Sequence, residues 1–224
     1  MARGIFVTGT DTGVGKTLVA ATLIRALAAS GLRTAAMKPV AAGSRRTSAR
    51  WRNDDADALL AACSGPLAYA DVCPYPLAEP AAPEIAAELQ SVRIDPDVLV
   101  AAYARLSAVH DIVVVEGVGG WEAPLDRGLL QSDLCRRLDL PVLMVVGLRL
   151  GCLNHARLTQ RALAADGMRF AGWIGSAVDP LLEHAVRVEE LLRRDIDAPH
   201  LGTLPHTPLP RADALCGLLR IDGL

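Results

Sequence analysis

A glycine-rich loop near the amino terminus has the composition and spacing of a phosphate-binding site. The segment GTDTGVGKT, Gly9 to Thr17, follows a predicted strand and opens a predicted helix. Its glycines allow backbone N–H groups to turn toward phosphate oxygens, and the helix start adds the positive end of its dipole. Lys16 would bind between the β- and γ-phosphates, and the Thr17 hydroxyl would ligate Mg²⁺. The loop is one residue longer than the usual GxxxxGK[ST], but composition alone would produce it only about once in a thousand chains, which predicts nucleotide binding.

The chain has only two lysines, and their positions indicate where a phosphate group could bind. Of the 23 lysines and arginines, only Lys16 and Lys38 are lysine. A lysine is a compact point charge, whereas an arginine is a planar fork, so a narrow site between phosphate oxygens favours lysine. Lys38 lies at the end of a predicted strand, where we expect it to face the same crevice as the phosphate loop. Two ammonium groups at one γ-phosphate suit phosphoryl transfer to an acceptor that is itself an anion.

Carboxylates that could complete a magnesium site follow two other segments. Glu116 ends the predicted strand DIVVVE, and a carboxylate at the carboxyl end of a parallel strand faces the crevice where ligands bind. Asp54 and Asp55 follow Asn53 at a predicted helix start. One of these two aspartates could be a helix cap and the other a metal ligand. Spacing alone does not choose between them.

These side chains must be positioned by an alternation of short apolar strands and helices rich in alanine and leucine. The strands are apolar throughout, as in a parallel sheet covered on both faces. The pattern predicts an α/β fold, one doubly wound and mostly parallel sheet with helices on both faces, in a single domain over residues 1–224. The predicted strands are Gly4–Thr8, Thr34–Pro39, Asp111–Glu116, Val142–Gly147, Phe170–Ser176 and His200–Leu204. The predicted helices are Lys16–Ser30, Asp54–Ala62, Pro96–Ala108, Leu129–Arg137, Leu153–Asp166, Pro180–Arg194 and Ala212–Leu219.

Composition limits the classes of protein that this chain can be. The 224 residues are 51% hydrophobic and 21% charged, with a net charge of -2, a pI near 6.2 and a mean hydropathy of +0.29. This composition excludes disorder and argues against nucleic-acid or membrane binding. No apolar run approaches the length of a membrane helix, and the first residues do not resemble a signal peptide. The five cysteines have no metal-ligand spacing, so we expect free thiols in a reducing cytoplasm.

Two loops and one tryptophan leave alternatives open. The segment Ala42–Asn53 carries four arginines, which could steer anions or form a solvated face. The segment Tyr69–Pro83 is rich in proline and could close over a substrate or simply cross the surface. Trp121 follows the glycines after Glu116 and either lines the site or packs in the core.

Taken together, these segments resemble the dethiobiotin synthetases, ATP-dependent ligases of biotin biosynthesis with a P-loop NTPase fold. The resemblance extends from residue 5 to about 205. It is carried by FVTGTDTGVGKT, TAAMKPVAAGS, RNDDADAL, YPLAEPAAP, VVVEGVGGWEAPL, LPVLMVVGLRLGCLNHARLT and AGWIGSAV. It implies carboxylation of 7,8-diaminononanoate by CO₂ or bicarbonate, ATP-dependent phosphorylation of the carbamate, and closure of a cyclic urea. It also implies Mg²⁺, a homodimer and a cytoplasmic enzyme.

The resemblance assigns roles residue by residue. Lys38 would bind the carbamate and the transferring phosphoryl group, and Lys16 and Thr12 would stabilise the γ-phosphate. The metal ligands would be Thr17, Asp55 and Glu116. A turn that captures the substrate carboxylate in the partner subunit corresponds to Gly151, Cys152 and Leu153. The remaining nucleotide contacts would be Gly13, Val14, Gly15, Leu18, Gly117, Gly119, Ser176, Ala177 and Pro205.

Two positions of this sequence differ from the family pattern. Two other functions are alternatives to the one that the resemblance implies. Ala42 stands near the diamine where the family often has a serine or threonine, and Ser44 is a candidate substitute. Ser176 stands where the family has an asparagine that reads adenine. The alternatives are a nucleotide-dependent switch and a related ligase acting on another substrate. Asp11 argues against the switch, because partition-type ATPases carry a lysine at that point of the loop.

Overall fold

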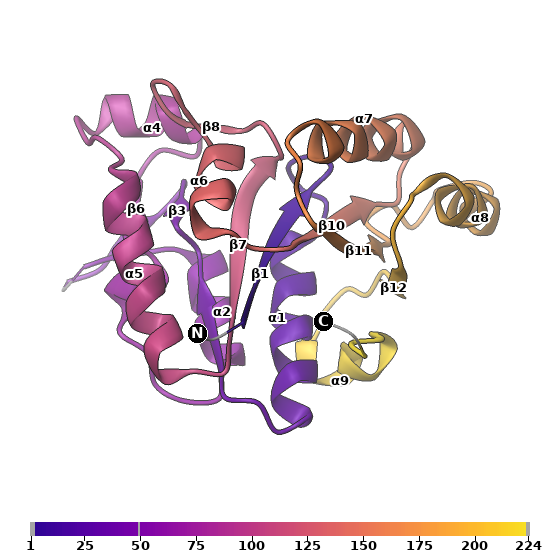
Figure 1. Cartoon of the computed structure of the whole chain (residues 1–224), viewed down its shortest axis with the longest axis horizontal. Helices are drawn as coiled ribbons and strands as arrows, with labels where there is room; N and C mark the ends of the chain where they lie inside the picture. Colours follow the sequence, from indigo (N-terminus) through magenta and orange to yellow (C-terminus); the bar gives the residue numbers. More distant parts are fainter. Residues whose placement is uncertain (1–2, 49, 223–224) are drawn as a thin grey trace.

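Six parallel strands form the central sheet of the protein. The computed structural model describes residues 3–48 and 50–222, so the ends of the predicted domain 1–224 lie outside the described residues. The sheet order is β12-β11-β10-β1-β7-β2, and every neighbouring pair is parallel (Figure 1). The strands are β1 (Arg3–Gly9), β2 (Thr34–Met37), β7 (Ile112–Gly120), β10 (Val142–Gly147), β11 (Phe170–Ser176) and β12 (His200–Leu204). All six predicted strands are therefore confirmed.

Helices cover both faces of this sheet. One face packs against α1 (Lys16–Ala29), α2 (Asp54–Ala62) and α9 (Ala212–Leu215). The other packs against α5 (Pro96–Val109), α6 (Gln131–Leu138), α7 (Cys152–Ala165) and α8 (Ala185–Asp195). The predicted doubly wound α/β fold is thus confirmed. Strand β1 lies near the middle of the sheet, which places the loop after it at the centre of one edge.

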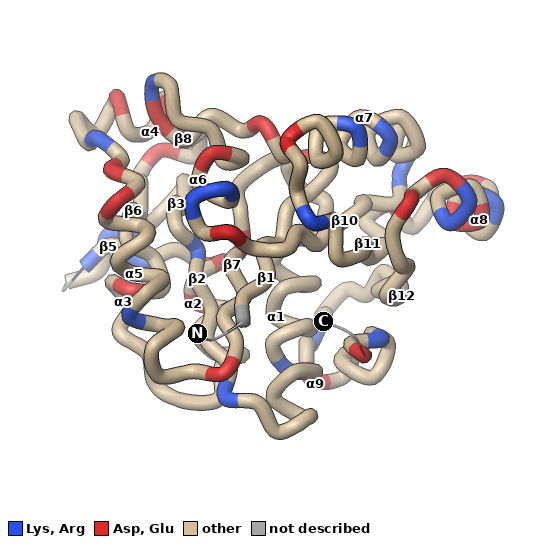
Figure 2. Tube along the Cα trace, in the orientation of Figure 1, with Lys and Arg blue, Asp and Glu red and all other residues tan. Residues whose placement is uncertain are grey.

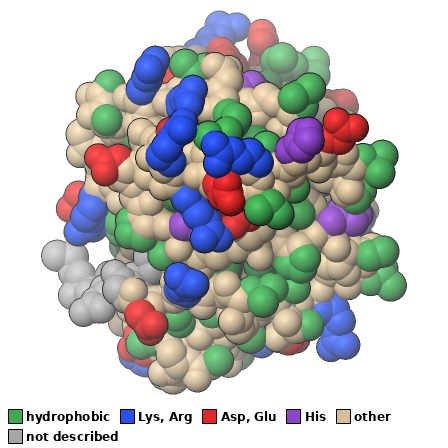
Figure 3. All heavy atoms as spheres, turned by 90° about the vertical axis from the view of Figure 1, so that its right-hand side faces the viewer, with side chains coloured by type: hydrophobic (Ala, Val, Ile, Leu, Met, Phe, Trp, Pro, Cys, Tyr) green, Lys and Arg blue, Asp and Glu red, His purple; other side chains and the backbone are tan. Residues whose placement is uncertain are grey.

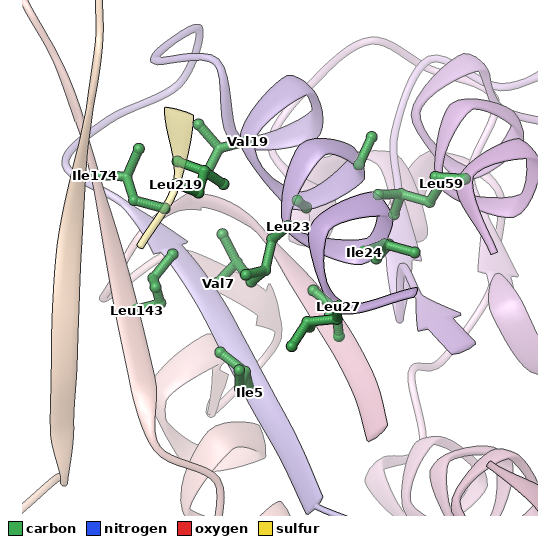
Figure 4. Close-up of a cluster of buried hydrophobic side chains, with 14 of the residues drawn as sticks. Ile5, Val7, Val19, Leu23, Ile24, Leu27, Leu59, Leu143, Ile174 and Leu219 are labelled. Carbon is green, nitrogen blue, oxygen red and sulfur yellow. The ribbon is translucent and has the colours of Figure 1, made fainter. Parts of the chain in front are cut away.

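The helix after the phosphate loop is fixed by its apolar face. Gly15 takes a left-handed conformation with φ of 85°, and the helix begins at the next residue. Leu23 and Ile24 of α1 are fully buried; Leu23 lies beside Val7 of β1, and Ile24 lies on the side of α1 nearer Leu59 of α2 (Figure 4). Burying one such side chain contributes about 1.5–3 kcal/mol. This packing holds α1 against the sheet with its first turn at the end of β1.

Several short elements lie between or after the main strands and helices. Helix α4 (Pro83–Leu89) begins with a proline at its first position, where a missing N–H costs nothing. The predicted proline-rich loop also contains α3 (Tyr69–Val72). The other short elements are β3 (Val40–Ala41) with β6 (Tyr75–Pro76), β4 (Arg45–Arg46) with β5 (Trp51–Arg52), β8 (Pro124–Asp126) with β9 (Leu129–Leu130), and a 3₁₀ turn at Cys216–Leu218.

Several predicted boundaries were wrong by a few residues. Strand β7 continues to Gly120 instead of ending at Glu116, whereas β2 ends at Met37, before Lys38. Helix α8 begins only at Ala185, because residues before it form a turn and His184 takes a left-handed φ of 58°. The predicted helix Leu129–Arg137 begins at residue 131, after β9. The last helix ends at Leu215 and continues as the 3₁₀ turn.

Charged residues lie mainly on the outer helices and loops, whereas the strands carry few of them (Figure 2). In the arginine-rich segment, Arg45 pairs with Asp54 and Asp57. Arg52 pairs with Asp57 and stacks over the Tyr69 ring at 4.0 Å. Local carboxylates therefore neutralise these two arginines, as on a solvated face. Within residues 3–48 and 50–222, no helix combines the length and the apolar character needed to cross a membrane.

Candidate active site

A cavity of about 790 Å³ opens at the carboxyl ends of β1, β2 and β7. It is where three strand ends meet the start of α1, a common place for ligands in open α/β sheets. The structure brings together ten of the predicted site residues there. They are Thr12, Gly13, Gly15, Lys16, Thr17, Lys38, Ala42, Asp55, Glu116 and Gly119.

The phosphate loop encloses the Lys16 side chain. Its Nζ donates to the carbonyl oxygen of Asp11 at 2.9 Å and to that of Gly119 at 2.7 Å. Gly13 and Gly15 both have a positive φ, and a Cβ on Gly15 would lie 2.5 Å from Oγ of Ser176. Gly15 therefore needs glycine for its backbone angle and for the close approach of β11.

Lys38 joins the two predicted acidic ligands. Its Nζ lies 2.5 Å from Oε1 of Glu116 and 3.2 Å from Oδ2 of Asp55, and it donates to the Gly117 carbonyl at 3.1 Å. Its side chain is 4% exposed, and that of Glu116 is 1% exposed. Strands β2 and β7 are parallel neighbours with Met37 paired to Val115, so Lys38, just past the end of β2, lies beside Glu116 within β7. The predicted convergence of Lys38 and Glu116 on the phosphate loop is present.

The oxygen atoms at this edge suit a magnesium ion. The Thr17 hydroxyl donates to Oε1 of Glu116 at 2.9 Å, and Oε2 of Glu116 is buried with no hydrogen-bond partner among the described residues. Asp55 faces Lys38, whereas Asp54 is 86% exposed and pairs with Arg45. Among the described residues, no group of three or more His, Cys, Asp or Glu side chains is placed to hold a metal ion. A metal at this edge would be held by the Thr17 hydroxyl together with the carboxylates of Asp55 and Glu116. Hard oxygen ligands of this kind fit Mg²⁺.

Burial and neighbouring charges shift the acid–base behaviour of these groups. Burial, with the nearby Lys38 ammonium, lowers the pKa of Lys16 to about 8. Burial also opposes charge on Lys38, but Glu116 and Asp55 outweigh it and raise the pKa of Lys38. For Asp55, burial is outweighed by Lys38 and by the Thr17 hydrogen bond, so its pKa is lowered. Lys38 thus carries a fixed charge, whereas Lys16 can lose its proton in mildly alkaline solution.

Other predicted site residues do not line this cavity. Val14 is buried under the loop, and Leu18 lines a separate cavity of about 400 Å³ with residues 210–213. Ser176 is 4% exposed and packs on Gly15 at the end of β11. Further residues outside the lining are Gly117, Ala177, Pro205, Gly151, Cys152 and Leu153.

Sequence reasoning missed an apolar side of the cavity. Residues 80–83 line it opposite the phosphate loop, together with Val118, Ala123 and Pro124. The proline-rich composition was the available signal, and the alternative in which this segment covers a substrate agrees with its position. Such a surface suits a hydrocarbon chain better than a charged group.

For Ser44 and Trp121 the sequence allowed a role at the site or in the core, and in the structure both have core roles. The Ser44 hydroxyl is buried and donates to the Ala41 carbonyl at 3.1 Å, so it is already satisfied. The Trp121 side chain lies outside the cavity, with Nε1 donating to Asp166 at 2.6 Å and its ring packed edge-on to Phe6. Trp121 therefore packs in the core.

Solved structures with this fold include nucleotide-binding proteins. A ParA family ATPase from Chlorobium tepidum has a TM-score of 0.58 at 14% identity, covering 93% of this chain and 86% of that chain. The septum site-determining protein MinD from Pyrococcus horikoshii, complexed with Mg-ADP, has a TM-score of 0.57 at 18% identity, covering 98% and 87%. These likenesses establish the fold alone.

Curated relatives are far more similar in sequence. The family model AAA_26, described as an AAA domain, matches residues 3–212. The ATP-dependent dethiobiotin synthetase of Xanthomonas oryzae pv. oryzae is 50% identical over 212 residues, 93% of each chain. That of Xylella fastidiosa is 50% identical over 206 residues, covering 91% of this chain and 90% of its own. The chain therefore belongs to the AAA_26 family and to the family of ATP-dependent dethiobiotin synthetases.

Proposed function

We propose that this protein is an ATP-dependent dethiobiotin synthetase, a carbon–nitrogen cyclo-ligase. It joins CO₂ to 7,8-diaminononanoate as a carbamate, transfers the γ-phosphoryl group of ATP to the carbamate oxygen, and closes the ring. In the last step the second amine attacks the carbamoyl carbon, phosphate leaves, and the amine proton is released. Membership of the family supports this reaction.

The observation that carries the proposal is the meeting of both lysines of the chain at one cavity. Lys16 and Lys38 line it together with Glu116. A protein that only binds a nucleotide needs one lysine on the phosphates, whereas an anionic acceptor needs a second cation beside the transferring group. The acceptor oxygen of a carbamate is such an anion.

The side chains divide the work of phosphoryl transfer. Lys38 binds the carbamate and the phosphoryl group that it receives, and Lys16 neutralises charge on the γ-phosphate with the Thr12 hydroxyl. The backbone amides of residues 13–17 bind phosphate oxygens at the start of α1. Holding carbamate and ATP in one closed site makes the transfer effectively intramolecular. Activation is required because a free carbamate is a poor electrophile.

Mg²⁺ would be held by Thr17, Asp55 and Glu116. When bound, it neutralises charge on the phosphate oxygens during transfer. The unpartnered Oε2 of Glu116 supports this assignment. Lys38 shares both carboxylates with that site, so its ammonium is kept charged and close to the transferring group.

The diamine and the nucleoside occupy opposite ends of the site. The hydrocarbon chain of the substrate contacts the apolar side at residues 80–83 and 42, and the base end of ATP extends toward Leu18, Ser176, Ala177 and Pro205. Ser176 has a hydroxyl instead of an amide, so base selection rests on fewer hydrogen bonds.

We further infer a cytoplasmic homodimer in which the turn Gly151–Leu153 binds the substrate carboxylate of the partner subunit. This turn begins α7 and lies outside the cavity of its own chain, and the neighbouring Leu150 is 93% exposed. Leu181 and Val186, near the start of α8, are 85% and 76% exposed. Figure 3 looks onto the α8 side, where apolar side chains lie among arginines, acids and histidines.

The test is ADP release in the presence of Mg·ATP, bicarbonate and 7,8-diaminononanoate, with the product identified by mass spectrometry. Release should depend on the diamine and give a product that contains one added carbonyl in a ring. ADP release that is unchanged when the diamine is omitted would contradict the proposal and favour a nucleotide switch.

A further inference from the structure

A bulge at the end of strand β7 forms the backbone that both lysines contact. Strands β1 and β7 pair at Val7 with Glu116 and next at Gly9 with Gly120, so four positions of β7 span two positions of β1. The residues between them leave the regular ladder. Within this segment the Gly117 carbonyl accepts from Lys38 and the Gly119 carbonyl accepts from Lys16.

The side chain of Gln131 makes hydrogen bonds to the backbone of β7 where the strand leaves its regular pairing with β1. Gln131 is the first residue of α6 and is 1% exposed. Its Oε1 accepts from the Val118 N–H at 2.5 Å, and its Nε2 donates to the Gly120 carbonyl at 2.9 Å and toward Thr8 Oγ1 at 3.3 Å. Since one partner is a donor and the other an acceptor, only this orientation of the amide satisfies both. A primary amide has the same pair of groups as the peptide unit that it replaces.

The contact is close enough to constrain the sequence of the bulge. A Cβ on Gly117 would lie 2.2 Å from Oε1 of Gln131. The main chain of α6 is also held to this region, because the Gln131 N–H donates to the Ala123 carbonyl at 2.9 Å. Helix α6 therefore fixes the side chain, and the side chain fixes the bulge.

We propose that Gln131 is a positioning residue for phosphoryl transfer: its amide sets the orientation of the Gly117 and Gly119 carbonyls, which in turn place the ammonium groups of Lys38 and Lys16. Gln131 touches neither lysine and does not line the main cavity. It acts through the backbone, and its contribution is to the geometry of the two cations. A buried amide with both groups paired is well suited to this, because each of its hydrogen bonds would be costly to leave unmade.

This inference rests on the proposed function for its kinetic test, but it also has a readout without substrate. The chain has only two lysines, so protein labelled with [ε-¹³C]lysine gives one methylene signal for each. The variant Gln131→Met keeps the length of the side chain and removes all its hydrogen bonds. The variant Gln131→Glu keeps an acceptor for Val118 and places an oxygen against the Gly120 carbonyl.

Both variants should shift both lysine signals and lower kcat by about tenfold or more, which corresponds to the loss of one buried hydrogen bond. Affinity for ADP, which keeps the β-phosphate but lacks the γ-phosphate, should fall by a smaller factor than kcat. Ser132→Ala is the matched control, because Ser132 is the adjacent buried residue of α6 and its hydroxyl has no partner among the described residues. It should leave the lysine signals and kcat unchanged.

Unmoved lysine signals with wild-type kcat in both variants would overturn the assignment. A lower melting temperature with unchanged kcat would overturn it as well, because the role would then be structural only. If Gln131→Met is not recovered folded, Gln131→Glu decides. Failure of the wild type to release ADP with the diamine would instead refute the proposed function, and the lysine signals would still test Gln131.

Discussion

The ammonium nitrogen of Lys38 lies 2.5 Å from Oε1 of Glu116, although 78 positions separate the two residues in the chain. Both groups are almost completely buried. Each charge is therefore desolvated and depends on the other, and removing one partner would leave the other uncompensated at the edge of the phosphate site. Variants of Lys38 and Glu116 therefore test the proposed roles of these two residues.

Replacing Lys38 should strongly lower turnover and leave nucleotide binding nearly unchanged. Lys38→Met removes the cation beside the proposed acceptor, and we expect kcat to fall about a hundredfold or more, since one preorganised group that stabilises developing charge contributes about 10²–10³ to kcat. ADP affinity should stay within about threefold. Steady-state ADP release and calorimetric ADP titration measure the two effects.

Lys38→Arg tests the shape of the cation. The guanidinium fork does not fit the place of a buried ammonium among Glu116, Asp55 and the Gly117 carbonyl, so we expect it to be nearly as inactive as Lys38→Met. Turnover close to wild type in either variant would refute a direct role of Lys38.

Replacing Glu116 should weaken the response to magnesium. Glu116→Gln keeps the shape of the side chain and removes its charge, so the Mg²⁺ concentration for half-maximal turnover should rise about tenfold or more. ADP binding in the presence of a chelator should be unaffected. An unchanged magnesium titration would show that Glu116 is not a ligand.

Affinity for ATP should fall as pH rises above about 8. The pKa of Lys16 is lowered to about 8 in the free protein, because burial disfavours its charged form. The bound triphosphate needs the ammonium form, so the free protein must take up a proton on binding once the pH exceeds this pKa. The dissociation constant should rise up to about tenfold per pH unit, from a plateau below about pH 7.

Calorimetry at pH 7.0 to 9.5 in buffers of different ionisation enthalpy measures this proton uptake. The variant Lys16→Met has no ammonium at this position. Its affinity for ATP should be weaker than that of the wild type and should not show the fall above about pH 8. A wild-type affinity that is flat across the same range would contradict the lowered pKa.

Restoring a hydroxyl at position 42 should improve binding of the diamine. Ala42 lines the cavity, and one added hydrogen bond contributes about 1 kcal/mol, so Ala42→Ser should lower KM for the diamine about fivefold with kcat nearly unchanged. Ser44→Ala is the control, because that hydroxyl already donates to Ala41. A larger effect of Ser44→Ala on KM would show that Ser44 contacts the substrate instead.

The thiols should differ sharply in reactivity. Burial raises the pKa of Cys63, Cys73 and Cys135 to about 12, so these groups stay protonated and unreactive at neutral pH. Cys216 is partly exposed. A chromogenic disulfide reagent should label Cys216 rapidly in the native protein, and Cys216→Ser should remove that phase. Rapid labelling of any of the first three would contradict their burial.

The sequence predicted correctly those elements whose conformation depends on neighbouring residues in the chain. The strand, loop and helix around Gly9–Thr17 follow from glycine conformations and a helix start, and the six strands follow from their apolar runs. The ends of strands were predicted less accurately. A strand such as β7 ends where its hydrogen bonds to neighbouring strands end, and the sequence of the strand itself does not show this position. The short helix at Pro83–Leu89 was missed because it is only seven residues long and is packed in part by β8, which is distant in sequence.

The sequence by itself determined the chemistry that this protein can perform: a phosphate loop, two lysines retained among arginines, and carboxylates at strand and helix ends. Only the tertiary structure decided which groups act together. It turned Asp55 toward Lys38 and left Asp54 exposed, placed residues 80–83 along the cavity, and brought the amide of Gln131 against the bulge of β7. The physical reason is that spacing along the chain fixes local conformation, whereas strand order and helix packing bring residues from distant segments to one edge of the sheet.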